Sequence, residues 1–230
     1  MLDGIFLPGL IYRLPVGFYT ILGRDVVKQF VRRIRSEQLI IESAKQLINQ
    51  KGCQKTTFAE LIQLTGLSKG AIYHYVSSKD DLMAKVLSSL LEESNDQFFY
   101  KLSEGEKALL NPSDVLAGQM KAMEKPDQMI GKIFVYLISR MDHQTARDAL
   151  DDFYDSMFQF ALLWIRSGQK HGTIHPNLDP SKAAELYLLM LDGFRLRTTL
   201  YHSSFKLSSE ELSPILTMLF SQQSFLSGPD

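Results

Sequence analysis

The chain has 230 residues, of which 45% are hydrophobic and 22% are charged, so its composition is that of a globular protein and excludes a disordered or fibrous one. The formal net charge of −1 hides an asymmetry: residues 1–90 carry 12 Lys and Arg against 7 Asp and Glu, whereas residues 91–230 carry 13 against 19. Because phosphates attract a basic segment and repel an acidic one, any nucleic-acid contact is expected in the first part.

Residues 1–35 are apolar and are broken repeatedly by glycine and proline, which excludes a long helix through them. The basic residues follow the apolar stretch, unlike those of a secretory signal, and Arg13 and the prolines interrupt any membrane span, so no membrane partner is expected. Two interpretations stay open. This N-terminal extension is either a poorly ordered segment without a role, or a basic arm, from Lys28 to Arg35, that adds phosphate or minor-groove contacts to a DNA-binding unit.

The apolar spacing of residues 36–50 predicts an amphipathic helix, with Ser36 as its N-cap and Lys51-Gly52 as its stop. Cys53, the only cysteine, follows directly. A single cysteine excludes an intrachain disulfide and a cysteine-rich zinc site, and it favours a reducing, cytoplasmic compartment. It is either a redox-sensing thiol or, as we favour, a small core residue.

Two short helices separated by a tight turn are predicted next. Thr57, with Glu60 three residues later, forms a capping box for the first helix. Gly66-Leu67-Ser68 is long enough only for a turn, with Ser68 capping the second helix, KGAIYHYV. A helix that buries Ile72 and Val76 leaves a narrow outer face that fits a major groove about 12 Å wide. The side chains expected on that face are Lys69, Gly70, Tyr73 and His74.

Residues 52–82, GCQKTTFAELIQLTGLSKGAIYHYVSSKDDL, closely resemble the N-terminal domain of the TetR family of bacterial transcriptional regulators. The resemblance implies that Thr57, Tyr73 and Lys79 contact DNA phosphates, and Thr56, the other threonine of the pair, is placed with them. It also implies that Ser68, Lys69, Gly70 and His74 lie on the groove-facing stretch that varies with operator sequence. Phosphate contacts position such a protein on DNA, and base contacts specify the sequence. Val76 and Thr65 depart from the family's usual phenylalanine and alanine at packing positions.

Residues 83–230 are predicted to be helical throughout, without a glycine-rich phosphate loop or a catalytic carboxylate pair, so no enzyme is expected. His143, His171 and His175 do not share a helix face with a completing acid, so neither a metal nor another cofactor is expected. Two predicted helices, 149–167 and 181–200, carry apolar residues on two sides, and one core covers only one side.

The second side requires another chain or an internal cavity, and the resemblance suggests both a homodimer and a small-molecule pocket. For the dimer, Leu189 is the residue whose replacement by a charge is expected to disrupt self-association. For the pocket, ordinary core packing remains the alternative role of each candidate. The apolar candidates, with Arg140 to meet a polar group, are Met129, Phe134, Met157, Phe158 and Trp164.

These observations predict an all-α protein with an N-terminal three-helix DNA-binding domain at 36–82 and a larger ligand-binding and dimerisation domain at 83–230. The predicted function is a ligand-responsive repressor that binds a palindromic operator as a homodimer, because one short helix contacts too few bases for useful specificity. Two other hypotheses stay open: a DNA-binding protein without an effector, and a helical enzyme.

Overall fold

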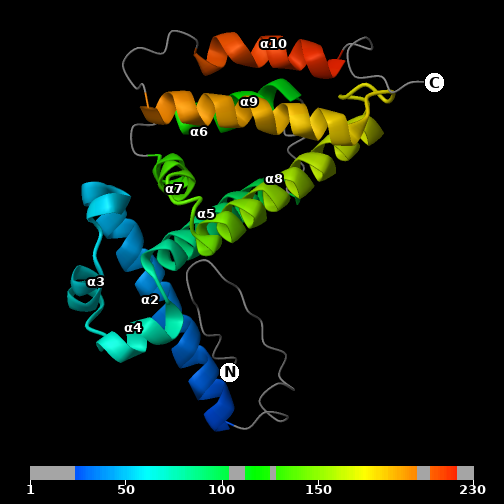
Figure 1. Ribbon diagram of the computed structural model, residues 1–230. Helices are drawn as coiled ribbons and strands as arrows, with labels where there is room; N and C mark the ends of the chain where they lie inside the picture. The colour runs from blue at the N-terminus through cyan, green and yellow to red at the C-terminus, as the bar shows by residue number, and fades with distance from the viewer. Residues whose placement is uncertain (1–23, 104–111, 125–127, 201–207, 222–230) are drawn as a thin grey trace.

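The computed structural model describes residues 24–103, 112–124, 128–200 and 208–221, and these residues form helices and the turns between them, without a strand. Figure 1 shows a small N-terminal head of α2 (Arg24–Lys55), α3 (Phe58–Thr65) and α4 (Lys69–Tyr75). The larger part holds α6 (Pro112–Met123), α7 (Met129–Ile138), α8 (Gln144–His171), α9 (Pro180–Leu200) and α10 (Ser209–Ser221). Helix α5 (Lys79–Ser103) begins at the head and continues into the larger part, where it packs against α7 and α8. The all-α class, with a helix-turn-helix followed by a helical domain, is therefore confirmed.

The start of α2 differs from the sequence prediction. The helix begins at Arg24, twelve residues before Ser36, so the predicted start at Ser36 is wrong. The physical reason is that no glycine or proline interrupts the chain between Gly23 and Gly52, and nothing therefore stops the helix from extending. Residues 1–23 of the expected extension lie outside the described residues. At the other end, Gly52 has φ 80° and ψ 166° and kinks the helix, a conformation that favours glycine.

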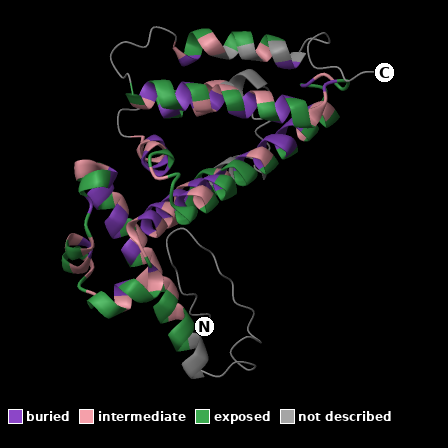
Figure 2. Ribbon diagram, viewed as in Figure 1, coloured by how far each residue is buried: buried purple, intermediate pink, exposed green. Residues whose placement is uncertain are grey.

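A continuous core joins the head to the larger part. In the head, Ile40, Ala44 and Ile48 of α2 are fully buried, in agreement with the predicted apolar stripe, and α2 packs against α3, α5 and α7. In the larger part, α8 buries Phe153, Met157, Phe160 and Trp164. Figure 2 shows buried stretches along α8 and α9. No helix in the described parts is both long enough and apolar enough to cross a membrane.

The breaks on the two sides of α8 differ in how far the sequence marks them. Gly172 closes α8 in the left-handed conformation, with φ 74°, as glycine does after a helix end. The turn between α7 and α8, residues 139–143, contains no glycine or proline, so the sequence carried no signal for it. This turn is what brings Arg140 and His143 beside the head.

Candidate nucleic-acid interface

The α3–turn–α4 unit is built by the caps that the sequence predicts. The Thr57 hydroxyl accepts a hydrogen bond from the Glu60 amide at 3.4 Å, and the Ser68 hydroxyl accepts one from the Ala71 amide at 3.2 Å. Gly66 ends α3 with φ 67°, in the left-handed region. Thr65 donates to the Leu61 carbonyl at 2.7 Å and accepts from the Leu67 amide at 3.2 Å, so its hydroxyl stabilises the turn.

The outer face of α4 is exposed and carries small or donor-bearing side chains. Ile72 and Val76 are buried beneath it, while Lys69, Gly70, Tyr73 and His74 are exposed. Tyr73 is 46% exposed, and its ring stacks on Phe58 with 5.0 Å between centroids and 10° between planes. This stacking fixes the direction of the phenol without occupying its hydroxyl.

Gly70 leaves the surface of α4 open to a close partner. A Cβ built on this glycine meets no heavy atom of the described residues within 4 Å. The Lys69 ammonium lies 5.7 Å from the centre of the Tyr73 ring, close enough for a cation–π contact. The geometry therefore presents a bare strip of backbone flanked by a cation and an aromatic hydroxyl.

The two adjacent threonines occupy different environments. Thr57 is exposed, and its hydroxyl also donates to the Glu60 carboxylate at 2.5 Å. The Lys51 ammonium and this hydroxyl hold the pKa of Glu60 below its ordinary value. Thr56 is only 2% exposed and donates to the Gly52 carbonyl at 3.0 Å, so it stabilises the kink at the end of α2.

Lys79, the first residue of α5, is half-buried rather than free at the surface. Its ammonium donates to the Gln54 carbonyl at 2.6 Å and lies 5.7 Å from the centre of the Tyr136 ring. Burial lowers the pKa of this lysine. The side chain therefore connects the start of α5 to the end of α2.

Asp80 forms a junction between the head and the larger domain that the sequence reasoning missed. Asp80 and Asp81 both lie in the first turn of α5, but only Asp81 takes part in its capping. The Asp81 amide donates to the Ser78 hydroxyl at 3.1 Å, and its carboxylate accepts from the Ser77 amide at 2.7 Å. Asp80 is buried and accepts a hydrogen bond from the Tyr136 hydroxyl at 2.6 Å. The Arg140 guanidinium lies 3.3 Å from its carboxylate.

This junction lines a cleft of about 490 Å³ that also contains Lys79 and His143. Burial alone would raise the pKa of the Asp80 carboxyl, but the hydrogen bonds from Tyr136 and Arg140 outweigh it, so the pKa lies below its ordinary value. Only a long-range contact map would have found this cluster, because Asp80 and Tyr136 are separated by 56 residues and share no motif.

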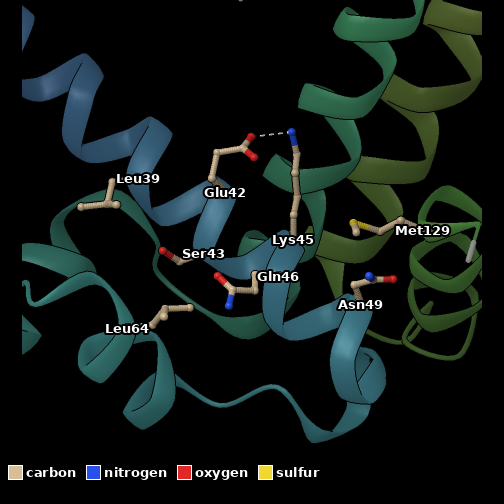
Figure 3. A pocket seen from close by; sticks show the side chains of 8 residues that line it. All are labelled: Leu39, Glu42, Ser43, Lys45, Gln46, Asn49, Leu64 and Met129. Carbon is tan, nitrogen blue, oxygen red and sulfur yellow. Dashed lines mark hydrogen bonds and ion pairs between the residues drawn. The ribbon is translucent and has the colours of Figure 1, made fainter. Parts of the chain in front are cut away.

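The candidate ligand residues lie in separate places. Met129 lines a cleft of about 590 Å³ with Leu39, Gln46 and Leu64 of the head (Figure 3), and Arg140 lies at Asp80. Phe134 and Met157 are buried in the core of the larger domain and Phe158 is half-buried against it. The described residues therefore do not bring the six candidates together into one pocket.

Arg195 of α9 is a buried cation that the sequence reasoning also missed. It is only 5% exposed, it lies between Phe134 and Phe153 at 5.2 and 4.9 Å from their ring centres, and it donates to Asp192 at 2.5 Å. Burial raises the pKa of Asp192 and lowers that of Arg195. The available signal was a pair of opposite charges at i, i+3 inside the apolar part of the helix, but Lys182 and Glu185 near the start of α9 have the same spacing.

Trp164 lies deeper in the same domain and carries an unpaired polar atom. Its ring packs 5.3 Å from that of Tyr187 and 5.7 Å from that of Phe220. The Trp164 indole nitrogen and the Tyr187 hydroxyl are buried without a hydrogen-bond partner among the described residues. Such groups are rare in a settled core, because each loses its hydrogen bonds to water.

The outer side of the last helices is apolar and uncovered. Leu189 is 71% exposed, and it lies on α9 with the exposed Leu196 and Leu200. On α10, which packs against α6, Ile215 and Met218 are also exposed. Of the second apolar side that the sequence predicts for residues 181–200, Leu189 and Leu196 therefore lie at the surface, whereas Leu191 is buried.

Cys53 and three histidines were the remaining candidates for a redox-sensing thiol or a metal site. Burial raises the pKa of the Cys53 thiol to about 11, which disfavours the reactive thiolate and agrees with a small core residue. His143 lies at the Asp80 junction, whereas His171 and His175 flank the end of α8. Across the described ranges, no three His, Cys, Asp or Glu side chains gather as a metal site.

Comparison with known proteins gives the same picture. Residues 40–86 match the family model of bacterial regulatory proteins of the tetR family. YfiR of Bacillus subtilis, an uncharacterized helix-turn-helix transcriptional regulator, is 23% identical over 70% of this chain and 78% of its own length. TtgR of Pseudomonas putida, also a helix-turn-helix transcriptional regulator, is 36% identical over 67 residues, which cover 27% of this chain and 32% of TtgR.

Solved structures share the fold over a longer stretch. GusR of Salmonella enterica has a TM-score of 0.59 at 17% identity and covers 81% of this chain and 95% of its own. A transcriptional regulator from Saccharomonospora viridis, solved in complex with choline, has a TM-score of 0.60 at 19% identity and covers 79% of this chain and 93% of its own. The similarity therefore extends from the head through the larger helical domain.

Proposed function

We propose that this chain, a transcriptional regulator whose N-terminal domain belongs to the TetR family, is a ligand-responsive repressor. We propose further that it binds a palindromic operator as a homodimer. The single observation that carries the proposal is the exposed outer face of α4. Tyr73 is held there by Phe58, and Gly70 leaves the backbone open to a major groove.

The DNA-binding roles follow from exposure and position. We assign base readout to Lys69 and His74, with Gly70 permitting the approach, because they share the exposed face of α4. Phosphate contacts are assigned to Tyr73 and to the two exposed caps, Thr57 and Ser68. Lys79 is also assigned to a phosphate, because its ammonium has three donors and gives one of them to the Gln54 carbonyl. Thr56, which is buried and donates to the Gly52 carbonyl, is assigned to holding the end of α2.

Dimerisation supplies the second half-site. One α4 helix of seven residues reads only a few base pairs, so useful specificity requires two copies one or more DNA turns apart. The exposed apolar residues of α9 and α10 offer a self-complementary face for a two-fold axis. Leu189, the most exposed of them, is assigned to its centre.

The effector is assigned to the larger domain. Its core contains the buried Arg195–Asp192 pair and the two unpaired polar atoms of Trp164 and Tyr187, which are available to a ligand's polar groups. The choline complex of the similar regulator supports a small-molecule site in a domain of this fold. A ligand that prefers one spacing of the two heads lowers DNA affinity through that preference.

The experiment that tests the proposal removes one hydroxyl. Tyr73→Phe keeps the stacking on Phe58, so the fold should stay intact, while the proposed phosphate contact is lost. The free energy of binding to duplex DNA should then weaken by about 1.5–3 kcal/mol, the contribution of a hydrogen bond to a charged group, on every sequence alike. The slope of log affinity against log salt should stay near that of wild type, because the lost hydroxyl is uncharged. Tyr75→Phe on the same helix is the matched control, since Tyr75 faces inward and is half-buried. Wild-type protein without any salt-dependent affinity for duplex DNA would refute the proposal itself.

A further inference from the structure

The first three turns of α2 extend beyond the head. Residues 24–35 continue the axis of α2 past the residues that pack in the core, whose first member on this helix is Ile40. Figure 1 shows this end of α2 at the same end of the molecule as α4, away from α8, α9 and α10. A duplex seated on α4 would therefore meet this segment, which we call the basic arm.

The cations of the arm are exposed and lack ionic partners. Lys28, Arg32, Arg33 and Arg35 are exposed, and none has an acidic partner within the described ranges. The lysines nearer the core behave differently, because Lys45 pairs with Glu42 and Glu93, and Lys51 pairs with Glu60. The described side chains therefore leave the charge of these four residues unneutralised.

Three of these cations share one face of the helix. A turn of 3.6 residues, about 100° per residue, places Lys28, Arg32 and Arg35 within about 60° of one another and puts Arg33 at least about 100° away. Leu39 and Gln46 lie on the same face further along α2, where they line the cleft opposite Leu64 of α3 (Figure 3). The face formed by Lys28, Arg32 and Arg35 thus points to the side of α2 on which α3 packs.

We propose that Lys28, Arg32 and Arg35 bind backbone phosphates of the duplex beside the half-site that α4 occupies. A helix is about 10–12 Å wide and does not enter a minor groove about 6 Å wide, so the arm lies along the phosphates instead. At about 1.5 Å per residue, the seven steps from Lys28 to Arg35 cover about 10 Å, and over that length of duplex axis one strand presents three to four phosphates, one about every 3.4 Å. The arm adds affinity for duplex DNA without adding sequence preference.

The test compares two neighbouring arginines in the full-length chain. Arg32→Ala and Arg33→Ala remove the same charge from the same helix, but only Arg32 lies on the proposed face. With a short mixed-sequence duplex, Arg32→Ala should lower the salt slope by about 0.9 per subunit, and the triple change of Lys28, Arg32 and Arg35 to Ala by about 2.7. Arg33→Ala should leave the slope near that of wild type, and circular dichroism should show the same helix content in all variants.

The outcomes separate this proposal from the DNA-binding function on which it rests. Equal effects of Arg32→Ala and Arg33→Ala would reveal general attraction without a directed contact and would overturn the proposal, as would an unchanged slope in the triple variant. In both cases wild type would still bind DNA, so the proposed function would survive. If wild type itself shows no salt-dependent binding, both proposals fall together.

Discussion

Tyr136→Phe tests whether the Asp80 junction stabilises the protein. The change removes only the hydroxyl that donates to the buried carboxylate at 2.6 Å, and it keeps the ring that Lys79 contacts. No cavity forms, because the phenyl ring fills the same space. The variant therefore measures one hydrogen bond between α7 and α5.

The expected magnitude follows from the charge of the acceptor. A hydrogen bond to a charged group contributes about 1.5–3 kcal/mol to folding. Arg140 still pairs with Asp80 in the variant, and its side chain is 37% exposed, so water also compensates the carboxylate. We expect the free energy of unfolding to fall by about 1.5 kcal/mol, the lower end of that range. In a chain of this size the melting temperature should then fall by about 3–6 °C.

Urea unfolding followed by Trp164 fluorescence provides the assay, because this is the only tryptophan and it is buried against Tyr187 and Phe220. Protein concentration must be held fixed, since self-association stabilises the folded state. Tyr73→Phe is the matched control: it removes a hydroxyl at an exposed position and should not change stability.

The effect of Tyr136→Phe on the free energy of unfolding should also depend on pH, in a direction that the pKa of Asp80 determines. The pKa of Asp80 is lower in the folded state than in the unfolded chain, so its stabilising contribution is present above the unfolded carboxyl pKa of about 3.9 and is lost as the pH falls through the folded pKa. The difference between wild type and Tyr136→Phe should therefore shrink in acid. Equal stabilities at neutral pH, or a difference that grows below pH 4, would refute the reasoning about this hydrogen bond.

Two further predictions concern the outer face and the helix contacts. Leu189→Glu should shift the protein toward monomer in sedimentation velocity while its helix content stays constant. Leu39→Glu places the same charge at an exposed leucine of the head and should leave self-association unchanged. A dimer in both variants would place the interface elsewhere. Gly168→Ala should lower the free energy of unfolding by about 1–3 kcal/mol, because its Cβ would lie 2.7 Å from the Ile174 side chain. Gly118→Ala, where no described atom lies within 4 Å, should instead raise stability by up to about 1 kcal/mol, and urea titration distinguishes the two signs.

The helix-turn-helix could be predicted because its signals are local. Thr57 and Ser68 each cap a helix through an amide three residues away, and Gly66 adopts the positive φ that ends α3. The exposed face of α4 follows from Ile72 and Val76, which lie four residues apart and are both buried. Each of these features depends on a few neighbouring residues, so the sequence alone contains it.

The remaining features depend on distant residues. Thr56 and Thr57 are the same residue type, and only the kink at Gly52 decides that one is buried and the other exposed. Asp80 and Asp81 both suit a helix start, and Tyr136, far along the chain, decides which of them becomes part of the junction. Periodicity could find the buried stripe of α8, but it could not place Met129 at the head and Arg140 at Asp80.

Helix α7 connects the two halves of the molecule through side chains on opposite faces. Phe134 packs on Arg195 in the core of the larger domain, and Tyr136, about 200° around the helix, donates to Asp80 at the start of α5. Gly131 permits α7 to approach α9 so closely that a Cβ there would collide with the Thr199 side chain. The hydrogen bond joins α7 to α5, so a shift of α7 relative to α5 changes its length or direction. Stability measured through Tyr136 therefore also reports how firmly the DNA-reading head is held by the domain behind it.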